Sequence, residues 1–422
     1  MTVIRLAIKS LANRWLTAAL TVFAIAISVM LLLGIEKLRH SAKASFANTV
    51  SGVDLVVGAR TGNIQLILNA VFQIGNPVAN MSWKSFQAVS ERKDVAWAVP
   101  ILLGDSHRGH RVVGTSAEFF DRYRFRGERQ LEFRNGNVFS KVFEVVIGAE
   151  VAERFDYAVG GKITLSHGTG PISTAEHDDM PFVISGVLER TGTPLDKSLF
   201  VSPAAIEAIH INWKDGLPIQ GRSAPTQAVI ETMADKLIPT SISAAFVGLT
   251  SPIQTFEVQR FVNRYRREAL TAAMPALTLY EMWGLVGTAE TALLLIAAMV
   301  VITSLVGMVT MILATLSERR RELAILRAMG AGPRTVLGLV LSESTILAAL
   351  GVLLGVGATY IALYLVRPVI DRAYGLSLDV TAPTTTELMI LGAIILGGAL
   401  AGLVPAMRAY AMSLADGMNV RN

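Results

Sequence analysis

The 422-residue chain contains no cysteine and few charged residues. The absence of cysteine excludes disulfide bonds, thiolate zinc sites, iron–sulfur clusters and cysteine nucleophiles. Only 17% of the residues are charged and 52% are hydrophobic, whereas a soluble domain carries about 25% charged residues. This balance excludes an ordinary cytosolic protein and an intrinsically disordered chain. Because the net charge is only +5, the placement of the charges matters more than their number.

The sequence also lacks the short motifs of hydrolytic enzymes. We find no G-x-S-x-G elbow, no H-E-x-x-H pair and no complete phosphate-binding loop. Gly160–Gly161–Lys162 is similar to the end of such a loop, but Asp156 and Ile163 replace the required glycine and hydroxyl residue. A β-turn is the better interpretation, and we expect the chain not to be an enzyme.

Four long apolar runs dominate the remaining sequence. They are Trp15–Ile35, Thr291–Leu313, Val336–Val366 and Leu388–Met407, and the only charge inside them is Glu343. About 20 apolar residues cross the hydrocarbon layer as a helix, so the sequence predicts an α-helical membrane protein with four transmembrane helices. We assign a leader at 1–14, spans at 15–35, 284–313, 336–366 and 388–407, an outer domain at 36–283, loops at 314–335 and 367–387, and a tail at 408–422.

Basic residues predict the orientation of these spans. The leader carries Arg5, Lys9 and Arg14 without an acidic residue, and five arginines lie between the second and third spans. Because positive residues favour the cytoplasmic side, we expect both termini and the loop 314–335 to be cytoplasmic and residues 36–283 to be outside. The first apolar run is longer than that of a cleaved signal peptide, which favours an uncleaved anchor. The leader itself is open to two interpretations, an interfacial helix or a simple topogenic segment.

The outer domain shows alternating strand and helix patterns. Short β-branched runs, such as the one at Glu144–Gly148, alternate with helical segments such as Trp83–Arg92. This order predicts an α+β domain with a second lobe at about 129–225. Gly104–Gly109 is expected to be a turn between two strands.

The segment between the second and third spans carries the most information. In Ser317–Ala331 the charges come first, Leu323 and Leu326 share one helical face, and Gly330 and Gly332–Pro333 end the helix. A plain topogenic loop would account for the arginines but not for the apolar face or the stop. The pattern therefore predicts a short amphipathic helix that docks a cytosolic partner.

This loop resembles the signature loop of the FtsX-like permease family, which includes MacB-type exporters and lipoprotein-releasing permeases. The resemblance covers Thr291 to about Met412 and the N-terminal anchor. Glu144–Phe155 followed by Val159–Leu165 is similar to the core of the MacB-type periplasmic domain. The large outer domain inserted between spans one and two is thus expected to be MacB-like and periplasmic, in the bacterial inner membrane.

The resemblance implies a permease subunit of a type VII ABC transporter, which works by mechanotransmission. Such a permease pairs with a second permease copy and recruits a separate cytosolic ABC ATPase when, as in this sequence, no nucleotide-binding domain is present. ATP and magnesium would then be cofactors of the partner, and none would be bound by this chain. Leu38–Ala47 and Pro252–Arg267 would form a stalk. The residues expected to couple to the ATPase are Glu318, Arg319, Arg320, Arg321, Glu322, Leu323, Leu326 and Arg327.

Three further features have competing explanations. Glu343 is an acid inside a span, and we favour its pairing with an arginine of the loop over a role in transport. Gly351-x-x-x-Gly355 and Gly398-x-x-x-Gly402 favour close packing within the chain or against lipid over a dimer interface. His107 and His110 share one turn. The residue types of His167, His177, Asp178 and Asp179 make them candidate metal ligands, but we favour the interpretation that they are solvated loop residues.

Two other functions stay open at this point. The chain could be an FtsX-like scaffold that activates a periplasmic cell-wall hydrolase, although the large outer domain favours a transporter. It could also be a lipoprotein-releasing permease with Ile64–Phe72 as a mobile gate, although a buried helix is the better interpretation of that segment. Membrane lipid and a periplasmic substrate-binding or adaptor protein are further expected partners, and nucleic acid is not.

Overall fold

The computed structural model describes residues 2–47, 49–76, 79–168, 175–176, 180–211, 213–214, 217–218, 225–374 and 381–411. The chain divides into two compact units. The helical unit comprises Met1–Ser41, Val286–Val369 and Leu378–Asn422, and the soluble unit comprises Ala42–Leu285 and Ile370–Ser377.

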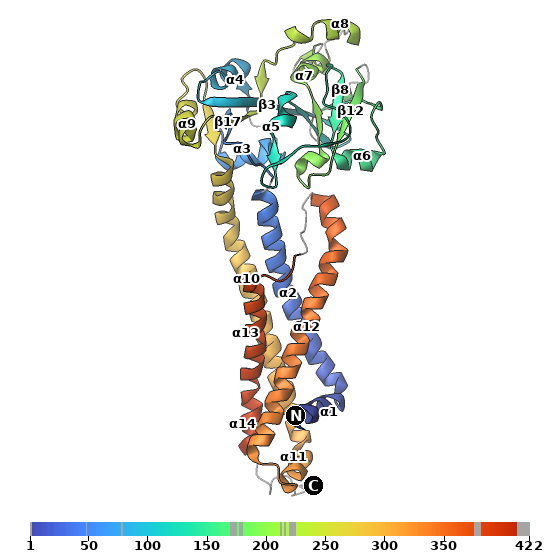
Figure 1. Cartoon of the computed structure of the whole chain (residues 1–422), viewed down its shortest axis with the longest axis vertical. Coiled ribbons are helices and arrows are strands. Elements are labelled where there is room, and N and C mark those ends of the chain that lie inside the picture. Colours follow the sequence, from blue (N-terminus) through green and yellow to red (C-terminus); the bar gives the residue numbers. More distant parts are fainter. Residues whose placement is uncertain are drawn as a thin grey trace. The chain divides into compact units, whose positions relative to one another are not determined.

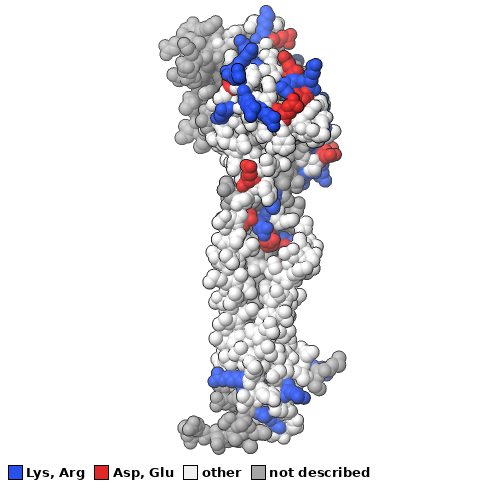
Figure 2. Space-filling view, turned by 90° about the vertical axis from the view of Figure 1, so that its left-hand side faces the viewer, with Lys and Arg blue, Asp and Glu red and all other residues white. Residues whose placement is uncertain are grey.

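The helical unit is built from long helices that run side by side (Figure 1). Four stretches, Trp15–Ser41, Val286–Leu316, Pro333–Val369 and Thr385–Ala411, are long and apolar enough to cross a membrane. On the face shown in Figure 2 this unit presents an uncharged surface over most of its length. The helices are α1 (Thr2–Ala12), α2 (Trp15–Ala47), α10 (Pro275–Glu318), α11 (Arg320–Ala328), α12 (Pro333–Tyr374), α13 (Thr385–Ala401) and α14 (Leu403–Ala411).

Each predicted span corresponds to one of these long apolar stretches. The helices extend beyond the apolar runs because the flanking charged turns also form helical hydrogen bonds, so α10 already begins at Pro275 and α12 continues to Tyr374. Hydropathy averaged over a window detects the apolar part of a helix and not the more polar turns at its ends.

Small residues let the helices of this unit approach one another closely. A Cβ atom added to Gly351 would lie 2.5 Å from Ile25 of α2, and one added to Gly355 would lie 2.7 Å from Val29. A Cβ added to Gly398 of α13 would lie 2.5 Å from that of Ala348 on α12. These small-residue spacings therefore pack helices of the same chain, which is the arrangement that the sequence analysis preferred to a dimer interface.

The soluble unit is an α+β domain around one mixed sheet, in agreement with the sequence. Most neighbours are antiparallel, but β12 pairs with β8 and β13 pairs with β4 in parallel. Along the main path the order is β18 (Leu270–Ala273), β1 (Leu55–Ala59), β17 (Ala244–Leu249), β3 (Val95–His107), β4 (His110–Gly114), β13 (Leu199–Val201), β8 (Glu144–Ile147), β12 (Phe182–Leu188) and β7 (Phe133–Gly136).

Short strands and helices complete this unit. β9 (Lys162–Ile163) pairs with β12, and β10 (Ser166–His167) pairs with both β3 and β11 (Ala175–Glu176). The helices are α3 (Asn63–Ala70), α4 (Trp83–Ser90), α5 (Glu118–Arg122), α6 (Ala149–Phe155), α7 (Pro203–Ile209), α8 (Gln227–Thr232) and α9 (Thr255–Asn263). Leu66 and Ile67 of α3 are buried, so this segment is the buried helix that the sequence favoured over a gate.

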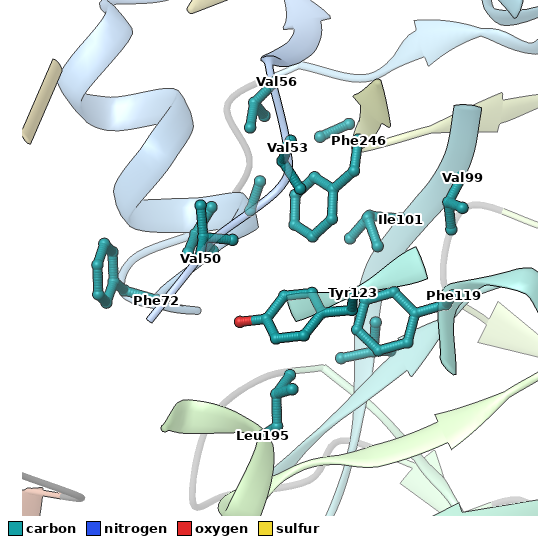
Figure 3. Close-up of a cluster of buried hydrophobic side chains, with 14 of the residues drawn as sticks. Val50, Val53, Val56, Phe72, Val99, Ile101, Phe119, Tyr123, Leu195 and Phe246 are labelled. Atoms are coloured by element: carbon teal, nitrogen blue, oxygen red, sulfur yellow. The ribbon is translucent and has the colours of Figure 1, made fainter. Parts of the chain in front are cut away.

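A cluster of buried hydrophobic side chains with several aromatic rings forms one core of the soluble unit (Figure 3). Phe119 of α5 lies 5.5 Å from Phe200 and 6.4 Å from Phe246, measured between ring centroids. Tyr123, one turn further on, is fully buried and donates its hydroxyl hydrogen to the backbone carbonyl of Thr49. Because Phe200 belongs to β13 and Phe246 to β17, the cluster joins both halves of the sheet.

Two sequence-based expectations for this unit are wrong. Gly104–Gly109 is not a turn throughout, because β3 continues to His107 and only Arg108 and Gly109 adopt the positive φ angles of the reversal. Pro252–Arg267 is not a stalk helix. It forms the short helix α9, whose Val258 and Val262 are fully buried in the core, and the chain then returns to the sheet as β18.

Candidate coupling site in the helical unit

The site begins where α10 ends and α11 turns away from it. Arg319 leaves the helical conformation with φ −87° and ψ 2°, and α11 starts at the next residue. At its other end Gly330 has φ +97°, a conformation that glycine adopts without strain. The amide of Gly330 donates to the carbonyl of Arg327, and the amide of Ala331 donates to that of Leu326. These two bonds form a Schellman stop, so α11 is a separate short helix.

α11 has a buried face and an exposed face. Leu323 and Ala324 are 5% and 9% exposed and belong to the core of the helical unit, and Leu326 packs against the same core. Ile325 and Met329 are 54% and 73% exposed. The expectation that Leu323 and Leu326 form the docking face is therefore corrected, because they hold α11 to its own bundle. Among the described residues of this stretch, Ile325 and Met329 are the large apolar side chains that stay exposed.

Arg319 is also oriented differently from the sequence-based expectation. Its side chain is 5% exposed, and its Nη1 atom lies 2.9 and 2.8 Å from the two carboxylate oxygens of Glu343 on α12. Its Nε atom lies 3.5 Å from Glu322 of α11 and has no hydrogen-bond partner among the described residues. Arg319 thus does not face outward to an ATPase. It connects the junction of α10 and α11 with α12.

The surrounding charges extend this network toward α2. Arg14, just before α2, lies 3.9 Å from Glu322, whose side chain is 66% exposed. Arg327 is half-buried on α11. The side chains of Glu318, Arg320 and Arg321 lie outside the described part of the structure. Glu343, which the sequence showed as an isolated acid in a span, has the arginine partner that was favoured for it.

A second buried ion pair, which no motif in the sequence indicated, lies at the opposite end of the helical unit. Lys37 of α2 is 3.1 Å from Glu387 of α13, and their side chains are only 6% and 2% exposed. Lys37 also donates to the carbonyl of Thr381 at 3.1 Å. Glu387 additionally closes a capping box with Thr384 at the start of α13. Lys37 and Glu387 each lie next to an apolar run in the sequence, and this position was the only feature that could have indicated the pair.

The histidines of the soluble unit have different surroundings. His107 and His110 are buried and contact the backbone carbonyls of Thr164 and Lys197 at 2.6 and 2.9 Å. Burial lowers the pKa of both imidazoles, so they are neutral packing residues at pH 7. His167 lies on β10 beside Asp105 and His210, two residues that the sequence did not connect with it. His177, Asp178 and Asp179 lie outside the described residues.

Comparisons with known proteins agree with this architecture. The model of the FtsX-like permease C-terminal region matches residues 294–414, and that of the MacB-like periplasmic core domain matches residues 18–259, more than half of the chain. The chain therefore belongs to the family of FtsX-like permeases with a MacB-like periplasmic core domain, a family of ABC transporter permeases.

One curated relative and two solved structures are similar to it. The macrolide export ATP-binding/permease protein MacB of Nitrobacter winogradskyi is 24% identical over an alignment of 432 positions, which covers 96% of this chain but only 58% of that protein. The periplasmic region of MacB from Actinobacillus actinomycetemcomitans is 10% identical, with a TM-score of 0.32 over 55% of this chain and 94% of that one. The extracellular domain of the transporter YknZ from Gram-positive bacteria is 13% identical, with a TM-score of 0.30 over 53% of this chain and 98% of that one.

Proposed function

We propose that the chain is the permease subunit of a mechanotransmission ABC transporter in the bacterial inner membrane. A separate cytosolic ATPase docks on α11, two permease copies form the membrane part, and ATP hydrolysis by the partner changes the conformation of the periplasmic domain. That change exports or extracts a substrate of the cell envelope. In this proposal ATP hydrolysis belongs to the partner, and the permease transmits the resulting motion.

The arrangement of α11 is the observation that supports this proposal most. A helix that buries one face in its own bundle and leaves Ile325 and Met329 exposed can accept a partner without unfolding. Exposed apolar side chains rimmed by charges are typical of docking surfaces. Because α11 is bounded by Arg319 on one side and by the Gly330 stop on the other, a partner can move it as one piece.

Arg319 supplies the connection from α11 to the spans. Its guanidinium bonds to both oxygens of Glu343, which lies in the third turn of α12. A displacement of α11 then pulls on α12 through two charge-assisted hydrogen bonds and not only through apolar contact, which slides more easily. α12 in turn packs on α2 at Gly351 and Gly355, so motion of one helix has to be accommodated by the other.

The test is an acidic substitution on the exposed face of α11. We expect Ile325→Asp to lower the amount of ATPase that co-purifies with the permease at least tenfold and to abolish stimulated ATP hydrolysis, with unchanged thermal unfolding. Ile238→Asp is the matched control, since Ile238 is 56% exposed in the soluble unit against 54% for Ile325. Normal co-purification with Ile325→Asp, or equal loss with Ile238→Asp, contradicts the docking assignment.

The proposed orientation has its own test, which the absence of native cysteine makes simple. Single cysteines are introduced at the exposed positions Glu128 and Thr335. A membrane-impermeant maleimide added to spheroplasts should label Glu128→Cys at once and Thr335→Cys only after the membrane is permeabilised. Labelling of Thr335→Cys in intact spheroplasts would place α11 outside and end the proposal.

A further inference from the structure

Three metal-ligand side chains from distant segments meet in the soluble unit. The Nδ1 atom of His167 lies 3.0 Å from Nε2 of His210 and 3.1 Å from Oδ1 of Asp105, and Nε2 of His210 lies 3.5 Å from the same oxygen. Regular structure sets each position. Asp105 and His167 are register partners on β3 and β10, and His210 directly follows the last residue of α7.

The hydrogen bonds of His210 decide which of its nitrogens faces the cluster as a lone pair. Nδ1 lies 2.7 Å from the carbonyl of Ile206, which can only accept, so Nδ1 carries the hydrogen and donates it. In the neutral ring Nε2 then presents its lone pair to His167 and Asp105. Two imidazole nitrogens and a carboxylate oxygen within 3.5 Å of one another require either a donated hydrogen on Nδ1 of His167 or a metal ion between them.

The triangle of ligand atoms has the size that a zinc ion needs. Zinc binds imidazole nitrogen and carboxylate oxygen at about 2.0–2.2 Å. From the three separations, a point about 2.0 Å from all three atoms exists and lies about 0.7 Å out of their plane. That position is close to the centre of a tetrahedron in which the ligand atoms occupy three of the four corners.

The surroundings of the cluster are those of a metal site with an accessible side. The Asp105 side chain is 2% exposed, whereas His167 and His210 are 33% and 26% exposed and leave a route from solvent. The Ile206 carbonyl accepts a hydrogen bond from the far nitrogen of His210 and so orients the ring, as backbone carbonyls often do for metal-bound histidines.

We propose that Asp105, His167 and His210 bind one divalent zinc ion in the periplasmic domain. The ion fastens α7 to the edge formed by β3 and β10, and the two-histidine, one-carboxylate set leaves a coordination position for water or a further ligand. This site differs from the set of candidates drawn from the sequence, with which it shares only His167. It does not depend on the coupling role of α11.

The experiment uses the full chain, purified in detergent and stripped with EDTA. Zinc binding is measured by calorimetry and by competition with a chromophoric chelator, in the unmodified protein and in the variants His210→Ala and Asp105→Asn. We expect one zinc per chain and a raised temperature of unfolding, and a loss of affinity of at least a hundredfold in each variant. His40→Ala, in the helical unit, is the matched control and should bind like the unmodified protein.

A second readout separates metal binding from a folding defect. Cobalt should give visible ligand-field bands of a four- or five-coordinate ion in the unmodified protein, and none in Asp105→Asn, which preserves side-chain size. Unfolding in EDTA shows whether each variant is folded. Absence of zinc binding in the unmodified chain would leave a hydrogen on Nδ1 of His167 as the link between the three side chains and overturn the proposal. Unchanged binding in folded His210→Ala and Asp105→Asn would overturn it equally, because the ion would then lie elsewhere.

Discussion

Replacing Glu343 by leucine should destabilise the helical unit strongly, although leucine is the more apolar side chain. The substitution leaves the Arg319 guanidinium, which is 5% exposed, without its carboxylate partner. Removing one member of a buried ion pair costs about 3–5 kcal/mol, because the remaining charge stays buried and unpaired. Arg319→Met should cost a similar amount, since it leaves the Glu343 carboxylate alone.

The double variant has a different expected outcome. At 2.8 Å and an effective dielectric constant near 20, the gross attraction of the pair is about 6 kcal/mol. Desolvation of the two ions costs several kcal/mol each, so the net contribution of the intact pair is small. Arg319→Met with Glu343→Leu removes both charges and should therefore be nearly as stable as the unmodified protein. The interaction energy of the cycle should be at least about 3 kcal/mol.

The assay is equilibrium unfolding of the four proteins in mixed micelles under identical conditions. Each variant is followed by the same spectroscopic signal, so that differences in the free energy of unfolding can be combined in the cycle. An interaction energy below about 0.5 kcal/mol would mean that the two side chains do not bond in the folded protein. The Arg319 connection between α11 and α12 would then have no physical basis.

Three further predictions concern other parts of the chain. Lys37→Met should lower the free energy of unfolding of the helical unit by about 3–5 kcal/mol, because the Glu387 carboxylate would stay buried without its cationic partner. Unfolding in mixed micelles measures this change, and a value below about 1 kcal/mol would contradict the buried pair. Gly355→Ala should lower the free energy of unfolding by about 1–3 kcal/mol in the same assay, because the added Cβ atom would contact α2. Gly357→Ala should be neutral or stabilising, because its added atom meets nothing within 4 Å. Equal effects of the two substitutions would contradict the helix packing. The carboxylate of Asp105 has a folded-state pKa of about 2 against 3.8 for the free group, so above pH 4 it contributes about 2 kcal/mol to the free energy of unfolding, and this contribution is lost as pH falls from 4 to 2. With EDTA present, the difference in thermal unfolding between the unmodified protein and Asp105→Asn should therefore shrink over that window. A constant difference would contradict the assignment.

Much of the architecture follows from patterns that act over short distances. The four apolar runs, the alternation of strands and helices, and the Gly330 stop each depend on neighbouring residues, and each was recognisable in the sequence. The segment Ser317–Ala331 also carried a family resemblance that the comparisons confirm. Its division into a short helix between two long ones could be predicted because glycine ends helices through its own backbone freedom.

Features that depend on tertiary contacts were harder to predict. The periodicity of α11 showed an apolar face but could not tell whether that face meets a partner or the same bundle, and the packing of Leu323 decided this. A row of arginines suggested solvent, whereas Arg319 turns inward because Glu343 requires a partner. Asp105 and His210 are 105 residues apart in sequence, so no motif could connect them with His167.

The central claim is that nucleotide turnover by a partner at α11 rearranges the periplasmic domain. It is tested most directly with a single spin label at Asp235→Cys, an exposed position of the soluble unit in a chain without native cysteine. Pulsed electron paramagnetic resonance measures the label-to-label distance between the two permease copies in nanodiscs with the co-purifying ATPase. The account predicts different distance distributions in the ADP-bound and ATP-trapped states, and a single unchanged distribution with Ile325→Asp. Identical distributions in both states of the unmodified complex, while the ATPase turns over, would contradict it.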